Sequence, residues 1–125
     1  MKTLFAVVGI AEMLVGAAFV LTPSPPAALI FGTPLDGPGE RAAAGVLGVV
    51  LAALGLAFWR ARDDHKSPAA GALIAALLVY NAGVAVLLAT SALIGTLSAP
   101  GLWPAVGFHA GLAAWGVWAV RKRFF

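Results

Sequence analysis

The sequence predicts an all-α protein: an integral membrane four-helix bundle with a short interfacial helix in the first outside loop. Hydrophobic residues make up 62% of the 125 residues and charged residues only 10%, which leaves too little polar surface for a soluble domain of this size. Residues 67–120 contain no Asp, Glu, Lys or Arg, so this stretch can hold two spans of about 20 residues each. Helices are expected, because open sheet edges leave backbone groups unpaired in lipid.

Four spans are expected to form a single transmembrane domain that covers residues 1–125. A run of prolines from Pro23 ends the first span, since proline removes a helical hydrogen bond. Ser24 precedes two prolines and Gly32 follows an apolar run, which predicts a short capped helix in the first outside loop. This helix is too short to cross a bilayer. The expected spans are residues 3–21, 41–59, 69–93 and 105–120.

The distribution of Lys and Arg predicts the orientation of the chain. Of the eight such residues, only Arg41 falls on one side of the four-span arrangement, and the other seven fall on the opposite side. Because cytoplasmic loops carry an excess of Lys and Arg, both termini are expected in the cytoplasm. The same residues lie at span ends, where lipid headgroups lie, so the expected partner is the bilayer and not nucleic acid. The seven residues are Lys2, Arg60, Arg62, Lys66, Arg121, Lys122 and Arg123.

Several chemistries are excluded. The chain has no cysteine, which rules out disulfides, thiolate metal sites and cysteine nucleophiles. Glu12 has no acidic partner at its depth, and no serine, histidine and acid lie at matching depths, so we expect no catalytic residues and no enzyme. No metal site is expected, because His65 lies on the opposite face of the membrane from His109. No cofactor is expected either, although a tetrapyrrole with His109 as its sole axial ligand stays open.

The second span presents a face of small residues below Arg41. In lipid, small residues allow a second helix to approach closely, because packing contacts replace the hydrophobic effect there. We expect this face to be a helix-packing surface, used within the chain, against a membrane-protein partner or in a homo-oligomer. Its residues are Gly45, Gly48, Ala52 and Gly55.

Each expected span carries one polar residue that is costly to place in lipid, namely Glu12, Arg41, Asn81 or His109. A rise of about 1.5 Å per residue places all four between the membrane centre and the outer side. Ionisable groups inside membranes usually face the bundle interior and pair there. We therefore expect these four residues and Tyr80 to line a polar pocket that opens to the outside and binds a ligand or a proton.

Structural roles for the same residues stay open. Arg41 could extend to the outer headgroups, with Glu40 as a surface partner. His109 could bond a neighbouring carbonyl, and Asn81 could link two helices by a hydrogen bond. Glu12 is the hardest of the four to explain by packing, since a carboxylate near the bilayer centre is costly.

The segment Gly9-Ile-Ala-Glu12-Met-Leu-Val-Gly16 resembles the first helix of the small multidrug resistance transporters. In that family an Ala-Glu pair followed by glycine carries the carboxylate that binds protons and cations, so the resemblance implies this role for Glu12. The other helices depart from the family pattern. The strong charge bias also differs from the dual insertion that many of its members use.

A second resemblance covers most of the chain. The order of its short motifs is similar to that of a group of small uncharacterised bacterial four-span proteins with DoxX-like architecture. This resemblance implies a four-span fold in a bacterial inner membrane and joint action of the polar residues, but no established activity. The motifs are Leu29-Ile-Phe-Gly32, Arg41-Ala-Ala-Ala-Gly45, Tyr80-Asn81, and Leu102-Trp-Pro104 with His109.

Two functional hypotheses follow from these residues. The first is a non-enzymatic membrane protein, which is either an accessory subunit or the binder of a small lipid-like or quinone-like ligand in the outer-facing pocket. The alternative is a proton-coupled small-molecule transporter that uses Glu12. The transporter ranks second, because the inner half of the expected bundle offers little polarity for an exit path.

Overall fold

The computed structural model describes residues 1–64 and 66–124, with side chains as far as Lys122. Within that part of the chain the regular structure is entirely α-helical, with five helices and no strands, which confirms the predicted all-α class. The helices are α1 (Lys2–Leu21), α2 (Ser24–Phe31), α3 (Pro38–Ala61), α4 (Pro68–Leu93) and α5 (Leu102–Phe124).

Three helices of the described chain are long and apolar enough to cross a membrane, namely α1, α3 and α4. They contain the expected spans 3–21, 41–59 and 69–93. The helix that contains the fourth expected span, α5, has 23 residues but is not one of these three. His109, Pro104 and three tryptophans lower its hydropathy relative to the others.

Two helices, α3 and α5, begin three residues before their expected spans. In α3 the first residue is Pro38, because proline is well suited to a first helical position. Glu40 holds this end in place, since its Oε2 accepts hydrogen bonds from the backbone N–H groups of Asp36 and Gly37, each at 3.1 Å. In α5 the helix begins at Leu102, because Pro104 lies in the first turn, where a missing N–H breaks no helical bond.

The short helix expected in the first loop is α2. It ends at Phe31 and is followed by the cap residue Gly32, whose φ of 85° is a left-handed conformation that glycine adopts without steric cost. Ala27 of α2 is buried, and the carbonyl oxygen of Leu29 accepts a hydrogen bond of 2.9 Å from the backbone N–H of Gly101. Through this bond α2 is joined to the beginning of α5.

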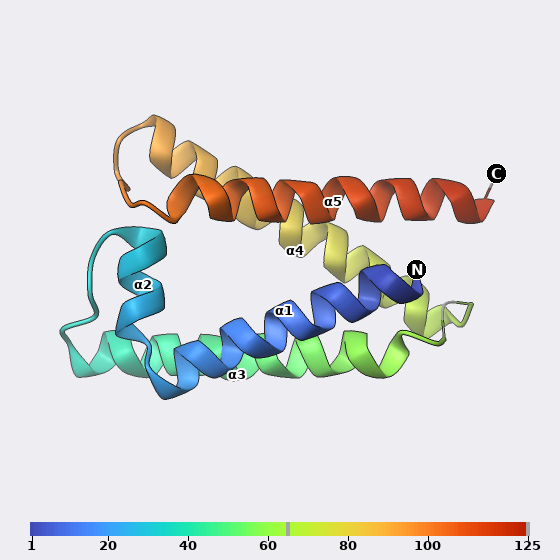
Figure 1. Ribbon diagram of the computed structural model, residues 1–125, viewed down its shortest axis with the longest axis horizontal. Helices are drawn as coiled ribbons and strands as arrows, with labels where there is room; N and C mark the ends of the chain where they lie inside the picture. Colours follow the sequence, from blue (N-terminus) through green and yellow to red (C-terminus); the bar gives the residue numbers. More distant parts are fainter. Residues whose placement is uncertain (65, 125) are drawn as a thin grey trace.

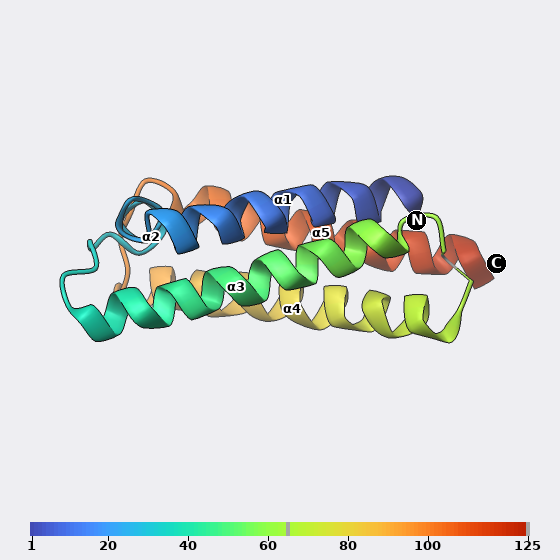
Figure 2. The ribbon, with the colours of Figure 1, turned by 90° about the horizontal axis from the view of Figure 1, so that it is seen from below.

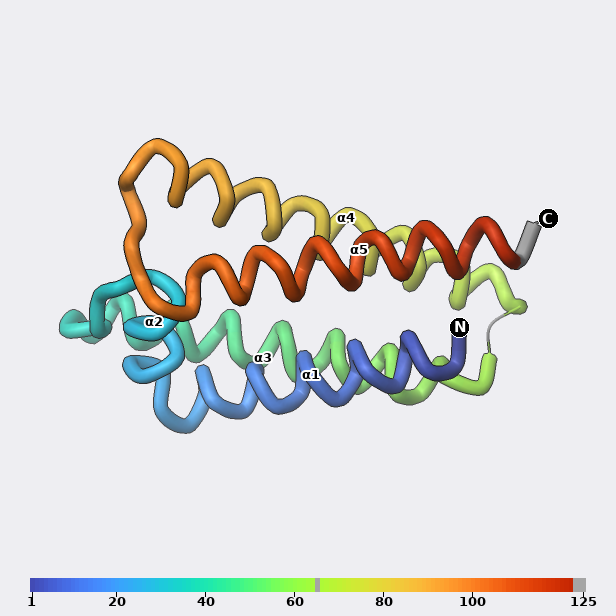
Figure 3. Tube along the Cα trace, turned by 45° about the horizontal axis from the view of Figure 1, so that its top comes forward, coloured from blue at the N-terminus to red at the C-terminus, as the bar shows by residue number. Residues whose placement is uncertain are grey.

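The four long helices form two antiparallel pairs (Figure 1). The first pair is α1 with α3, and the second pair is α4 with α5; both are seen again from below in Figure 2. The α2 helix lies where the two pairs separate, at the end of the bundle away from the N-terminus (Figures 1 and 3). The start of α1 and the end of α5 lie at the same end of the molecule (Figure 1).

The first pair is held by direct contact between two backbones. A Cβ atom at Gly16 would lie 2.6 Å from the carbonyl oxygen of Gly48 and 2.6 Å from the nitrogen of Ala52, and a Cβ at Gly9 would lie 2.9 Å from the carbonyl oxygen of Gly55. The small residues on α3 therefore pack against glycines of α1 in the same chain. Such close approach maximises dispersion contacts between helices in lipid.

Gly45 does not belong to this contact, although it is one of the residues expected on the small-residue face with Gly48. A Cβ atom added at Gly45 would meet nothing within 4 Å. The reason is the helical period, because residues four apart lie above one another on one face. Ala44, four residues before Gly48, is the buried residue at this level.

Apolar side chains fill the space between the pairs near the N-terminus. Phe5 of α1 and Phe58 of α3 are fully buried, and their ring centroids lie 5.4 Å apart. Leu77 of α4 and Leu112 of α5 belong to the same buried cluster. This end of the bundle is therefore a packed apolar core that joins the two pairs.

The glycine contact predicts opposite effects for one substitution at two positions. Gly16→Ala should lower the free energy of unfolding by about 1–3 kcal/mol, because its Cβ overlaps the α3 backbone. Gly45→Ala should raise it by up to about 1 kcal/mol, because its Cβ enters open space and alanine has a higher helix propensity than glycine. Unfolding in mixed detergent micelles measures both, and equal effects of the two variants would contradict the contact.

Candidate ligand-binding site

Four polar side chains meet midway along the bundle. The hydroxyl of Tyr80 donates a hydrogen bond of 3.2 Å to Oε2 of Glu12, which links α4 to α1. Nδ1 of His109 lies 2.8 Å from Oδ1 of Asn81, which links α5 to α4. The rings of Tyr80 and His109 meet edge to face, with centroids 5.5 Å apart. Three helices thus contribute to one polar cluster.

Burial differs within this cluster. Glu12 is 3% exposed and Asn81 is fully buried, and these are the buried polar side chains of the part of the chain that the structure describes. Tyr80 and His109 are half-buried. Because unpaired polar groups are costly in apolar surroundings, the hydrogen bonds of Glu12 and Asn81 are needed for these residues to occupy the bundle interior.

Local sequence explains the placement of each group. Glu12 lies on the same face of α1 as Gly9 and Gly16, whose contact with α3 keeps that face inside the bundle. Tyr80 and Asn81 are adjacent on α4, so their side chains point about 100° apart around the helix. One therefore reaches α1 and the other reaches α5.

A cavity of about 300 Å³ adjoins this cluster. Its polar side chains are those of Glu12, Tyr80 and His109, and its other walls are apolar residues of α1, α2 and α5. The helix α2 contributes Leu29 and Ile30. This combination of an apolar wall with a few converging polar groups is typical of sites for small molecules.

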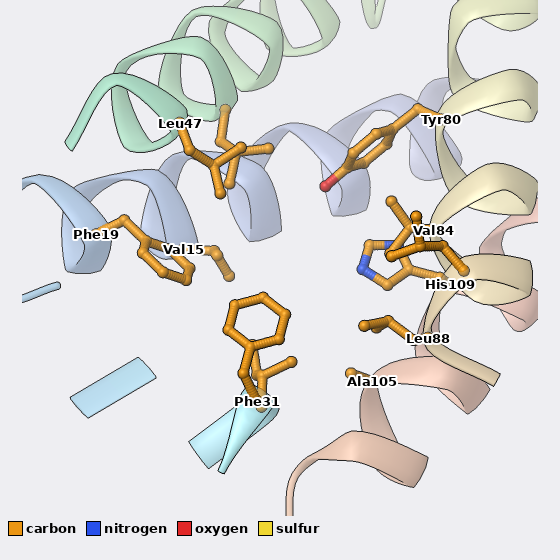
Figure 4. A pocket seen from close by; sticks show the side chains of 12 residues that line it. Val15, Phe19, Phe31, Leu47, Tyr80, Val84, Leu88, Ala105 and His109 are labelled. Atoms are coloured by element: carbon orange, nitrogen blue, oxygen red, sulfur yellow. The ribbon is translucent and has the colours of Figure 1, made fainter. Parts of the chain in front are cut away.

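A second cavity of about 190 Å³ shares part of this lining. Its lining includes Tyr80 and His109 together with residues of all five helices. Figure 4 shows the Tyr80 hydroxyl and the His109 ring directed into it, across from Phe19 of α1 and with Phe31 of α2 between the two sides. Val15, Ile30, Tyr80, Ala105 and His109 line both cavities, and both are partly open at the surface.

Arg41 is the expected site residue that the structure keeps apart from the others. It is exposed, its Nε donates to the carbonyl oxygen of Leu35 at 3.1 Å, and its Nη2 donates to that of Asp36 at 2.8 Å. Arg41 lies in the first turn of α3, so the preceding loop offers carbonyl acceptors within its reach. Arg41 was expected to line the pocket, but it lines neither of these cavities.

The pocket is also less polar than expected, because apolar residues that were not expected to line it form part of its wall. The apolar residues of α2, above all Ile30 and Phe31, line it. The apolar run after Ser24 was the available signal for them, but a helix too short to cross a bilayer was expected to lie at the membrane interface. No group of three or more His, Cys, Asp or Glu residues that could hold a metal ion occurs among the described residues.

Comparison with protein-family models, with curated proteins and with solved structures returned no match to this chain. The resemblances to DoxX-like proteins and to small multidrug resistance transporters therefore stay predictions.

The bond between Asn81 and His109 predicts a stability effect. Asn81→Leu should lower the free energy of unfolding by about 1–3 kcal/mol, because it leaves Nδ1 of His109 without its buried partner. Thr90→Val is the control, because the Thr90 hydroxyl bonds only carbonyls of its own helix and is exposed; it should have little effect. A neutral Asn81→Leu would argue against a structural role for this bond.

Proposed function

We propose that the chain is an integral protein of a bacterial inner membrane that crosses the bilayer four times. With α1, α3 and α4 as spans, the N-terminus and the start of α5 would lie on opposite sides. The 23 residues of α5 extend about 34 Å at about 1.5 Å per residue, and they return the chain to the end where α1 begins (Figure 1). This arrangement supports α5 as the fourth span.

The basic residues support a cytoplasmic location for both termini. Lys2 begins α1, Arg60 lies in the last turn of α3 and Arg121 lies late in α5, so all three belong to one end of the bundle. By the positive-inside rule this end is cytoplasmic. The α2 end, with the cavities, then faces the outer side of the membrane.

The function that the site supports best is the binding of a small lipid-like or quinone-like ligand, without catalysis, either by the chain alone or as an accessory subunit. The observation that carries this proposal is the cavity of about 300 Å³ in which Glu12, Tyr80 and His109 converge within otherwise apolar walls. The apolar walls suit the body of such a ligand, and the polar groups orient its head. Both cavities are partly open at the surface, which gives such a ligand a way in.

Filling the cavities tests this proposal. Ala105 lines both of them, so Ala105→Trp should occupy the space of the ligand. Binding of decylubiquinone and of monoolein, measured by native mass spectrometry of the detergent-solubilised protein, should be saturable for at least one of the two. Ala105→Trp should weaken that binding by at least about tenfold.

The matched control is Ala110→Trp, since Ala110 lies on the exposed surface of the same helix. It should bind as the unmodified protein does, within about twofold. Saturable binding that survives in Ala105→Trp, or its absence for both probes, would contradict a ligand site in these cavities.

A proton-coupled transporter that uses Glu12 is the second candidate, and the burial of this carboxyl group beside a cavity favours it. The buried residues between Glu12 and the cytoplasmic end are apolar and offer little polarity for an exit path. The transporter therefore ranks second. In proteoliposomes with an imposed proton gradient and the cation tetraphenylphosphonium as probe, a transporter should carry the probe in exchange for protons. Glu12→Gln should abolish the flux, and a flux that survives this change would exclude Glu12 as the carrier.

A further inference from the structure

The orientation of one amide group fixes the hydrogen on His109. Nδ2 of Asn81 donates to the carbonyl oxygen of Leu77 at 2.9 Å, so Oδ1 is the Asn81 atom that faces Nδ1 of His109 at 2.8 Å. An amide oxygen only accepts hydrogen bonds, and Nδ1 must therefore donate. In a neutral imidazole with its hydrogen on Nδ1, the other nitrogen, Nε2, is an acceptor.

This acceptor lies at the cavity. His109 lines both cavities. Figure 4 shows its ring entering the cavity of about 190 Å³ with a nitrogen at the tip. The ring is held by the bond to Asn81 on one edge and by its edge-to-face contact with Tyr80. The lone pair of Nε2 is thus presented to a ligand in a fixed direction.

The hydroxyl hydrogen of Tyr80 already forms a hydrogen bond within the protein. Tyr80 donates it to Oε2 of Glu12 at 3.2 Å. Glu12, Tyr80 and His109 provide the polar side chains among the described residues that line the cavities. With the hydrogens of Tyr80 and His109 both bonded inside the protein, the site offers a ligand chiefly acceptors, to which Glu12 adds its own oxygens when it is a carboxylate.

We infer that the cavity selects ligands whose polar head donates a hydrogen bond, which means a hydroxyl group on an apolar body, over ligands of the same shape whose oxygen can only accept. A hydroxyl pairs with Nε2 of His109. An ether or carbonyl oxygen in the same place faces a lone pair and stays unpaired, which is costly in an apolar cavity. Among quinone-like ligands the site therefore favours the hydroquinone form. This inference rests on the proposed binding function.

The test compares two pairs of probes that differ by one methyl group on the oxygen. The first pair is 4-dodecylphenol and 4-dodecylanisole, and the second pair is 1-dodecanol and dodecyl methyl ether. The phenol should bind the unmodified protein at least about tenfold more tightly than the anisole, as judged by native mass spectrometry titrations. A preference confined to the phenol pair indicates a phenolic head, and a preference in both pairs indicates hydroxyl groups in general, including those of glycerolipids.

His109→Phe tests the acceptor, because phenylalanine retains a ring and removes both nitrogens, Nε2 and the Nδ1 that pairs with Asn81. The phenol-to-anisole preference should fall to within about twofold, while the anisole still binds. His65→Phe, the same change at the other histidine of the chain, is the matched control and should keep the full preference. In the unmodified protein, ¹⁵N NMR of the imidazole should show the hydrogen of His109 on Nδ1.

The outcomes separate this inference from the proposed function. Equal affinities for phenol and anisole, or tighter binding of the anisole, would overturn the inference and leave the binding function standing. Saturable binding of none of the four probes would count against the binding function itself. A hydrogen on Nε2 in the NMR spectrum would overturn the inference whatever the affinities.

Discussion

Direct backbone contact between α1 and α3 is the constraint on which the rest of the bundle depends. Because Gly16 and Gly48 leave no room for a Cβ atom, the first pair forms one closely packed unit with a fixed inner face. Glu12 lies on that face between two of the contacting glycines. The contact therefore determines where the carboxyl group of Glu12 enters the bundle.

The polar cluster joins this unit to the second pair of helices. The bond from Tyr80 to Glu12 crosses between the pairs, and the bond between His109 and Asn81 lies within the second pair. On the N-terminal side of the cluster the space is filled by apolar side chains, whereas on the α2 side two cavities lie beside a smaller buried apolar cluster. The cluster thus marks the boundary between the packed end of the molecule and the end that holds the cavities.

Much of this arrangement could be predicted from single positions. The spacing of Gly9, Glu12 and Gly16 predicts a shared helical face, and the structure buries all three. The depths of Glu12, Asn81 and His109 place them in the same half of the membrane, and the structure brings these three together with Tyr80. Arg41 could not be placed in the same way, because its neighbours in the loop before α3 supply acceptors that the helical period does not reveal. The role of α2 was also hidden, since its packing depends on contacts with residues distant in sequence.

The hydrogen bond between Leu29 and Gly101 gives α2 two attachments that belong to different halves of the molecule. Its chain connections lead to α1 and α3, while this bond ties it to the beginning of α5. Any motion that spreads the halves apart must break the bond or pull α2 along with α5 and extend the segments that lead to it. The short helix α2 therefore connects the two halves at the end that holds the cavities. Its 8 residues limit how far the halves can separate there.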